Sequence, residues 1–189
     1  MNTFRYALLM MLLTTPAFGQ AVLHEHPAAS APTADATAAF DTLKTLAGSW
    51  AGRIATTPDV PGVSGQFVQF SLQVTSRGTA LLHEFSVSGL PDHPVTLFYL
   101  DGGLTLTHYC DAGNRPRMAG TLSPDGKTLT FEFVGISGNA DVGHMDRAVI
   151  TLIDENHHTE EWTFKTPGGE LVRARFELQR TNFQRPPAR

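Results

Sequence analysis

The stretch Leu104–Met118 gathers more side chains that can do chemistry than any other part of the chain. It holds an imidazole, a phenol, the only thiol and two guanidiniums, which belong to His108, Tyr109, Cys110, Arg115 and Arg117. The stretch begins as an alternating strand in which His108 and Cys110 share a face with Leu104 and Leu106. If these leucines face a core, His108 and Cys110 face it too.

Several of these residues suit a ligand that carries oxygen atoms. His108 could donate a hydrogen bond to a carbonyl or carboxylate, or bind a metal or haem iron. Arg115 and Arg117 could hold a carboxylate, because the planar guanidinium fork matches it with two hydrogen bonds. They could equally be rim charges flanking Pro116, and the alternation leaves the face of Arg117 open. Together with Tyr109, they form the first set of predicted ligand contacts.

A second pair of predicted ligand contacts is His83 and Glu84, on the expected strand Ala80–Ser88. His83 shares a face with Leu81 and Phe85, so we expect it to point inward. Glu84 takes the other face. If it were buried it would need a partner, because an unpaired carboxylate is costly to remove from water.

Three further histidines lie later in the chain. His144 lies in the glycine-containing segment 137–146, which is predicted to be a loop long enough to act as a lid. His157 and His158 lie beside a turn. Neighbouring side chains on a strand point in opposite directions, and both histidines are predicted to be solvated.

Catalytic and metal-binding motifs are missing from the sequence. It contains no Gly-x-Ser-x-Gly, no His-Glu-x-x-His and no Cys-x-x-Cys. A nucleophilic pair of Cys110 and His108 is a poor proposal, because side chains two apart on a strand lie about 7 Å apart. The sequence therefore predicts no catalytic residue and no metal site, although it does not decide whether the protein is an enzyme.

The elements that must position these groups are strands. The sequence predicts one short helix, Asp35–Leu46, capped by Asp35 or Thr37. Alternating segments separated by turn residues then predict ten strands: Ser49–Thr56, Gln66–Ser76, Ala80–Ser88, Pro94–Leu100, Leu104–Cys110, Arg117–Leu122, Thr128–Ile136, Arg147–Ile153, His158–Thr166 and Glu170–Arg180. Strands joined by hairpin turns predict an all-β, up-and-down antiparallel barrel of about eight to ten strands with a short N-terminal helix.

The helix leading into Gly48-x-Trp50 resembles the beginning of lipocalin-like (calycin) barrels. Over about Phe40–Arg180, the chain resembles exported bacterial proteins of this type that lack assigned activities. The resemblance implies that Trp50 and a late arginine plug one end of the barrel. The strand phase agrees, because Arg180 shares a face with Phe176 and the first and last strands should pair. Gly48, Trp50 and Arg180 are therefore predicted to be structural.

Both ends of the chain are expected to lie outside the barrel. Residues 1–21 show the three-part pattern of a signal peptide, with cleavage after Gly19 or Ala21. Residues 22–34 are predicted to be a disordered linker, 35–181 the barrel and 182–189 a flexible tail. These features predict a periplasmic or secreted protein. A net charge of −4 argues against a nucleic-acid partner, and few aromatic residues argue against membrane insertion.

The predicted function is binding of a small apolar or amphiphilic molecule in the barrel interior. One alternative is a haem-binding barrel of the nitrobindin kind. Its proximal histidine lies on a closing strand, and the closing strand Glu170–Arg180 has none. A second alternative is an isomerase or cyclase that works in the cavity, and a third is a filled barrel that serves as an interaction module. Neither the ligand nor the oligomeric state follows from the sequence.

Overall fold

The computed structural model describes residues 31–91 and 93–181. The predicted signal peptide, most of the predicted linker and the predicted tail lie outside the described residues. Among the described residues, no helix has the length and hydropathy needed to cross a lipid bilayer.

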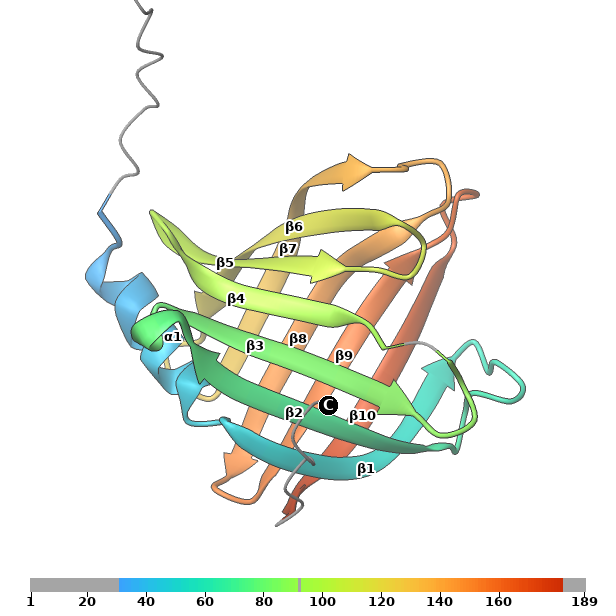
Figure 1. Ribbon diagram of the computed structural model, residues 1–189, viewed down its shortest axis with the longest axis horizontal. Helices are drawn as coiled ribbons and strands as arrows, with labels where there is room; N and C mark the ends of the chain where they lie inside the picture. The colour runs from blue at the N-terminus through green and yellow to red at the C-terminus, as the bar shows by residue number, and fades with distance from the viewer. Residues whose placement is uncertain (1–30, 92, 182–189) are drawn as a thin grey trace, which may run out of the picture.

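Among the residues that the structure describes, ten antiparallel strands form a closed barrel, with one α-helix at one end (Figure 1). The elements are α1 (Ala34–Lys44), β1 (Gly48–Thr57), β2 (Phe67–Thr75), the 3-10 turn η1 (Ser76–Gly78), β3 (Ala80–Val87), β4 (Val95–Asp101), β5 (Gly103–Tyr109), β6 (Asn114–Leu122), β7 (Thr128–Gly138), β8 (His144–Asp154), β9 (His157–Lys165) and β10 (Leu171–Thr181). Each strand pairs with its neighbours in sequence, and β1 pairs with β10. The predicted fold class is confirmed.

Three local predictions differ from the structure. The N-cap of α1 is Thr33, whose hydroxyl accepts a hydrogen bond from the backbone N–H of Ala36 at 3.1 Å, rather than Asp35 or Thr37. β6 begins at Asn114 and not at Arg117, although it contains a proline. β7 and β8 both extend into the predicted lid, so the connection is only the hairpin 139–143.

The cause of the last two differences is that polar residues continue a strand as readily as apolar ones when their neighbours pair. His144 and Met145 pair with Lys165 and Phe164 of β9. Hydrogen bonding to an existing neighbour therefore extends β8 beyond the reach of its hydrophobic pattern, and the predicted lid is wrong.

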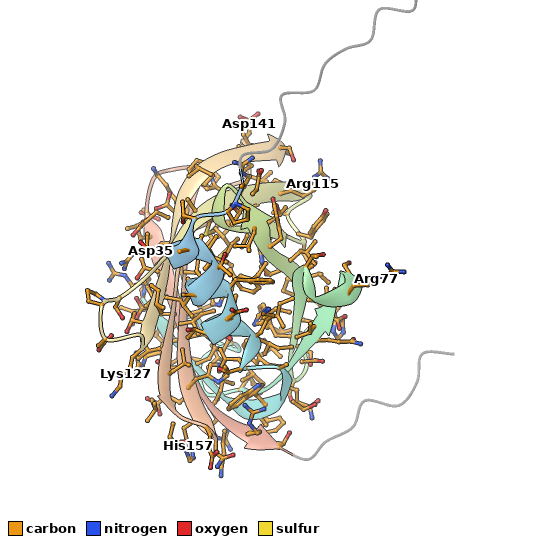
Figure 2. The ribbon with its side chains drawn as sticks, turned by 90° about the vertical axis from the view of Figure 1, so that its left-hand side faces the viewer. Asp35, Arg77, Arg115, Lys127, Asp141 and His157 are labelled. Atoms are coloured by element: carbon orange, nitrogen blue, oxygen red, sulfur yellow. The ribbon has the colours of Figure 1, made fainter. Side chains whose placement is uncertain are left out.

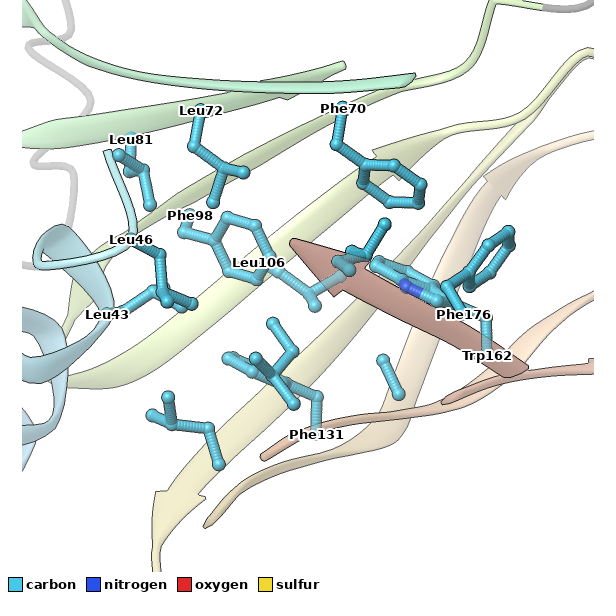
Figure 3. Packing of buried hydrophobic residues seen from close by; sticks show 14 of the residues in the cluster. Leu43, Leu46, Phe70, Leu72, Leu81, Phe98, Leu106, Phe131, Trp162 and Phe176 are labelled. Atoms are coloured by element: carbon cyan, nitrogen blue, oxygen red, sulfur yellow. The ribbon is translucent and has the colours of Figure 1, made fainter. Parts of the chain in front are cut away.

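The helix seals one end of the barrel. Figure 2 looks onto this end, with α1 lying across it. Leu43 and Leu46 are fully buried and project among Leu72, Leu81 and Phe98 from the strands (Figure 3). Each such side chain contributes about 1.5–3 kcal/mol when it is removed from water, so α1 is a structural plug for the barrel.

An arginine and a tryptophan join the first strand to the last at the same end. Trp50 lies directly opposite Arg180 in the pairing of β1 with β10, and the guanidinium carbon lies 4.1 Å from the centroid of the indole. Arg180 also donates hydrogen bonds to the carbonyls of Ala47 (2.8 Å), Thr45 (3.1 Å) and Glu155 (2.9 Å). One side chain thereby holds the helix, β1 and the β8–β9 turn together.

Gly48 leaves room for this arginine. Its φ of +141° is one that residues with a side chain rarely adopt, and a Cβ there would lie 2.6 Å from Nη1 of Arg180. Trp50 is fixed in turn, because its indole N–H donates to the Leu46 carbonyl at 2.8 Å. The glycine, the indole and the guanidinium therefore form one packed unit.

Arg180→Ala is expected to lower the free energy of unfolding by about 2–3 kcal/mol, because three carbonyls lose a charged donor and the indole loses its cation. Chemical denaturation measures the change. The control is Arg173→Ala, which removes an exposed arginine from the outer face of the same strand and should cost less than about 0.5 kcal/mol. Equal losses in the two variants would contradict a closing role for Arg180.

Candidate functional site

The barrel interior contains a buried carboxylate. Glu160 of β9 is fully buried, and His158 and Trp162 flank it on the same inward face. His83 reaches it from β3, and its Nε2 lies 3.2 Å from Oε2 of Glu160. β9 and β3 are not neighbours in the sheet, so this contact crosses the interior.

Three side chains hold this carboxylate. The indole N–H of Trp162 donates to Oε2 at 2.8 Å, and Nε2 of His158 lies 3.2 Å from Oε1. Burial by itself raises the pKa of Glu160, but the positive charge of His83 and the hydrogen bonds from His158 and His83 outweigh it. The net effect holds the pKa of Glu160 well below its ordinary value. The group is therefore a buried carboxylate that remains ionised at neutral pH.

A third histidine lies close to this cluster. His83, Thr96 and His108 occupy one row across β3, β4 and β5, because the register pairs His83 with Thr96 and Thr96 with His108. Nδ1 of His108 lies 2.8 Å from the hydroxyl of Thr96. Burial, and to a smaller extent the charge of His83, lower the pKa of His108 to about 3. His108 is therefore neutral at neutral pH.

Each of the three interior histidines leaves one ring nitrogen without a partner among the described residues. These atoms are Nδ1 of His83, Nε2 of His108 and Nδ1 of His158, and all three are buried. A buried polar atom without a hydrogen bond costs about 1–3 kcal/mol, so such atoms in proteins usually meet ordered water or a ligand. The interior thus offers unused hydrogen-bonding capacity.

The two ends of the barrel differ in how well they are covered. Near α1, inward-facing residues such as Leu81, Leu104 and Leu129 are fully buried, and Leu100, Leu122 and Leu152 are partly buried. At the opposite end Val68, Val87 and His108 are buried, whereas the other inward-facing side chains are half-buried; among these are Phe85, Phe133, Met145, Phe164 and Ala174. We call this second end the open end. Its lining is apolar and partly aromatic.

The sheet also loosens toward the open end. The pairing of β7 with β8 stops at Glu132 and Arg147. Beyond that point the two strands make no paired backbone contact, and the ring centroids of Phe133 and His144 lie 4.4 Å apart. His144, predicted to lie in a lid, is instead the first residue of β8 at this loosened seam.

The structure divides the predicted ligand contacts into two groups. His83 and His108 point inward, and their ring centroids lie 5.9 Å and 5.2 Å from that of Trp162. Glu84, Tyr109, Arg115 and Arg117 point outward. These four residues therefore do not share the interior with the histidines.

The outward direction of the arginines follows from the alternation of β6. Asn114, Pro116 and Met118 take the inward positions, which leaves Arg115 and Arg117 outside. Arg115 donates from Nε to the hydroxyl of Ser137 at 3.1 Å, and its outward direction is visible in Figure 2. Arg117 lies 3.7 Å from an Asp101 carboxylate oxygen on the surface. Both arginines therefore lie outside the interior that holds His108, and their contact with a ligand stays a prediction.

Sequence reasoning missed the centre of the cluster. His158 was expected to be solvated, and the structure buries it completely, while His157 is exposed as predicted. The alternation did contain the signal, because His158 and Glu160 are in phase with Trp162 and Phe164. No local pattern, however, shows that Glu160 meets His83.

Among the described residues, no group of three or more histidine, cysteine or acidic side chains is placed to hold a metal ion.

Comparison with known proteins shows that this chain is similar to several solved structures in its fold. No protein-family model matches the sequence, and no curated protein matches it. Rv2717c from M. tuberculosis has a similar structure, with a TM-score of 0.58, 17% identity and coverage of 76% of this chain and 98% of that one. A DUF3598-family protein of unknown function from Nostoc punctiforme PCC 73102 has a TM-score of 0.53 at 12% identity, with coverage of 84% and 53%.

A third similar structure is the S-type phycobiliprotein lyase CpeS from Guillardia theta. Its TM-score is 0.52 at 12% identity, and the alignment covers 81% of this chain and 100% of that one. These neighbours and the closed barrel of ten strands fit a lipocalin-like (calycin) fold. At such low identities the likeness concerns the fold alone.

Acid should destabilise the protein partly through His108. Its unfolded form binds a proton below about pH 6.5, but its folded form does so only below about pH 3, so stability falls as the pH drops through this window. Between about pH 6 and about pH 5, wild type should lose about 1 kcal/mol more than His108→Gln. Denaturation at each pH measures this, with mildly alkaline pH as the reference. Parallel pH profiles would show that the folded state does not exclude the proton.

Removal of the buried charge should also be costly. Glu160→Gln is expected to lower the free energy of unfolding at neutral pH by about 3 kcal/mol, because two imidazoles and an indole lose a charged acceptor. The pKa of Glu160 is lowered in the folded state. Its contribution is therefore present above about pH 4.5 and shrinks as the pH falls below that value.

The matched control for this variant is Glu161→Gln, which changes the neighbouring carboxylate on the opposite face of β9. It should change stability by less than about 0.5 kcal/mol. If both variants were equally stable, the buried hydrogen bonds would not be a net stabilising feature.

Proposed function

We propose that this protein binds a small apolar or amphiphilic molecule inside its barrel, and that the molecule enters at the open end. The observation that carries the proposal is the difference between the two ends. α1 and the Trp50–Arg180 unit seal one of them. At the other, several inward-facing aromatic and aliphatic side chains, among them Phe85, Phe133 and Phe164, are only half-buried. Apolar side chains that face an interior and keep part of their surface uncovered are typical of ligand-binding sites.

The polar atoms beneath this lining support the same proposal. The free ring nitrogens of His83, His108 and His158 could bond to a polar group of the ligand or to water that accompanies it. An apolar wall with a few convergent polar groups fits an amphiphilic molecule better than a pure hydrocarbon. We also propose export to the periplasm or beyond, on the pattern of residues 1–21.

The alternatives have less support. Haem binding in the nitrobindin manner depends on a histidine of the closing strand, and the inward positions of β10 are taken by Val172, Ala174, Phe176 and Leu178. One structural neighbour is a lyase, so a barrel of this shape is compatible with catalysis. The residues that line this interior do not yet indicate a reaction.

Native mass spectrometry of protein recovered from its source tests the proposal. Wild type should carry an extra small mass that is lost on collisional activation. Phe133→Ser should reduce the occupied fraction by about fivefold or more, because it removes apolar contact area from the open end.

The control is Val134→Ser, the neighbouring substitution at an outward side chain that is 53% exposed, and it should leave occupancy unchanged. Absence of a retained mass, together with no response of tryptophan fluorescence to added decanol, would contradict binding and favour the interaction module. A Soret band after addition of haemin would favour the haem alternative instead.

A further inference from the structure

The described interior offers hydrogen bonds but no buried lysine or arginine. Arg115 and Arg117 lie on the outer face. Arg180 donates its hydrogen bonds to three backbone carbonyls at the sealed end. A ligand carboxylate in this barrel would therefore meet no lysine or arginine within reach among the described residues.

The buried carboxylate already has three partners. The Glu160 carboxylate is in hydrogen-bond contact with Nε2 of His83, Nε2 of His158 and the indole N–H of Trp162. These contacts involve both of its oxygens. One nitrogen of each of these two imidazoles is thus committed to an internal anion, both of whose oxygens already accept hydrogen bonds. A second carboxylate brought into this region would also be repelled by the first.

His108 differs from the other two histidines in having no acidic partner. Its Nδ1 is bonded only to the hydroxyl of Thr96, at 2.8 Å, and this hydroxyl can either donate or accept. Whichever the hydroxyl does, the ring is satisfied in a neutral form. Nε2 is then left as a single uncharged donor or acceptor, buried and without a partner.

His108 is also the last inward-facing residue of β5 before the turn to β6 at the open end. Its ring packs beside Trp162, in contact with the polar cluster but not bonded to it. A molecule that enters from the open end would pass Phe133 and Met145. Met145 is an unbranched, adaptable side chain that could move to make room.

We infer that the polar group of the ligand is uncharged, a hydroxyl or a carbonyl, and that Nε2 of His108 makes the hydrogen bond to it. This inference rests on the proposed function. It assigns His108 as the residue that determines specificity and makes long-chain alcohols, aldehydes or ketones, rather than fatty acids or alkylamines, the favoured class. A neutral group needs one hydrogen bond to be satisfied, whereas a charged one would lose its hydration without compensation.

The test compares four probes that share a ten-carbon alkyl skeleton and differ in the group at its terminus: decanol, decanoic acid, decylamine and decane. Binding is followed at neutral pH by intrinsic tryptophan fluorescence and by native mass spectrometry. Wild type should bind decanol at least about tenfold more tightly than decanoate or decylammonium. His108→Leu should weaken decanol binding about five- to tenfold and leave decane binding unchanged or stronger.

Arg117→Ala is the matched control for charge, because this arginine lies on the outer face, and it should change the affinity for none of the probes. If His108→Leu does not fold, Thr96→Val replaces it, since the valine removes the bond that orients the imidazole. Thr96→Val should then reduce the preference for decanol over decane.

The outcomes separate the two proposals. If no probe binds, the proposed function fails and the inference fails with it. If decanoate or decylammonium binds as tightly as decanol, interior binding stands and the assignment of an uncharged group is overturned. If decanol keeps its full affinity in a folded His108→Leu variant, the hydrogen bond has been assigned to the wrong residue.

Discussion

Closure of the sheet on itself is the constraint on which the rest of this structure depends. When β1 pairs with β10, every second side chain of ten strands is directed into one shared interior. The Trp50–Arg180 contact secures that pairing where the chain enters and leaves the barrel. Without closure, β1 and β10 would be edge strands with unpaired backbone groups, and the interior would be one face of an open sheet.

The same closure explains how a charged group survives in the core. Transfer of an ionised carboxylate to an apolar interior costs several kcal/mol even after relaxation, so an isolated Glu160 would take up a proton instead. The barrel brings His83 from the far side and places His158 and Trp162 on the same strand. These donors outweigh the desolvation and keep the group ionised. A buried ion pair of this kind adds less to stability than its Coulomb energy suggests, because most of that energy offsets dehydration.

The two barrel ends are covered by different elements. A helix supplies a continuous apolar stripe, and Leu43 and Leu46 fill the space that the strands leave at one end. At the other end hairpins and loops connect the strands, Val63 and Leu90 of two of these loops pack against the core, and the β7–β8 ladder ends early. The polar cluster lies between these two ends.

Several features follow from the sequence alone because they are local. Alternation with a period of two placed His83 with Phe85 and His108 with Leu106 on inward faces, and turn residues between the strands predicted ten of them in an up-and-down order. The strand phase together with the Gly48-x-Trp50 resemblance was enough to bring Arg180 and Trp50 to one end. Strand ends were less certain, as at Asn114 and His144, because pairing extends a strand past its own hydrophobic pattern.

Other features were decided only by the tertiary structure. Glu160 and His83 are 77 residues apart, and whether they meet depends on the curvature and stagger of the whole barrel, which no stretch of sequence encodes. The burial of His158 and the outward direction of Arg115 and Arg117 agree with the alternation of their own strands, but closure of the barrel decided which face of each strand turned inward. The sequence determined the faces of the strands, because a side chain's face is set by its immediate neighbours. The fold determined which faces confront one another, because contacts across a barrel depend on every strand between them.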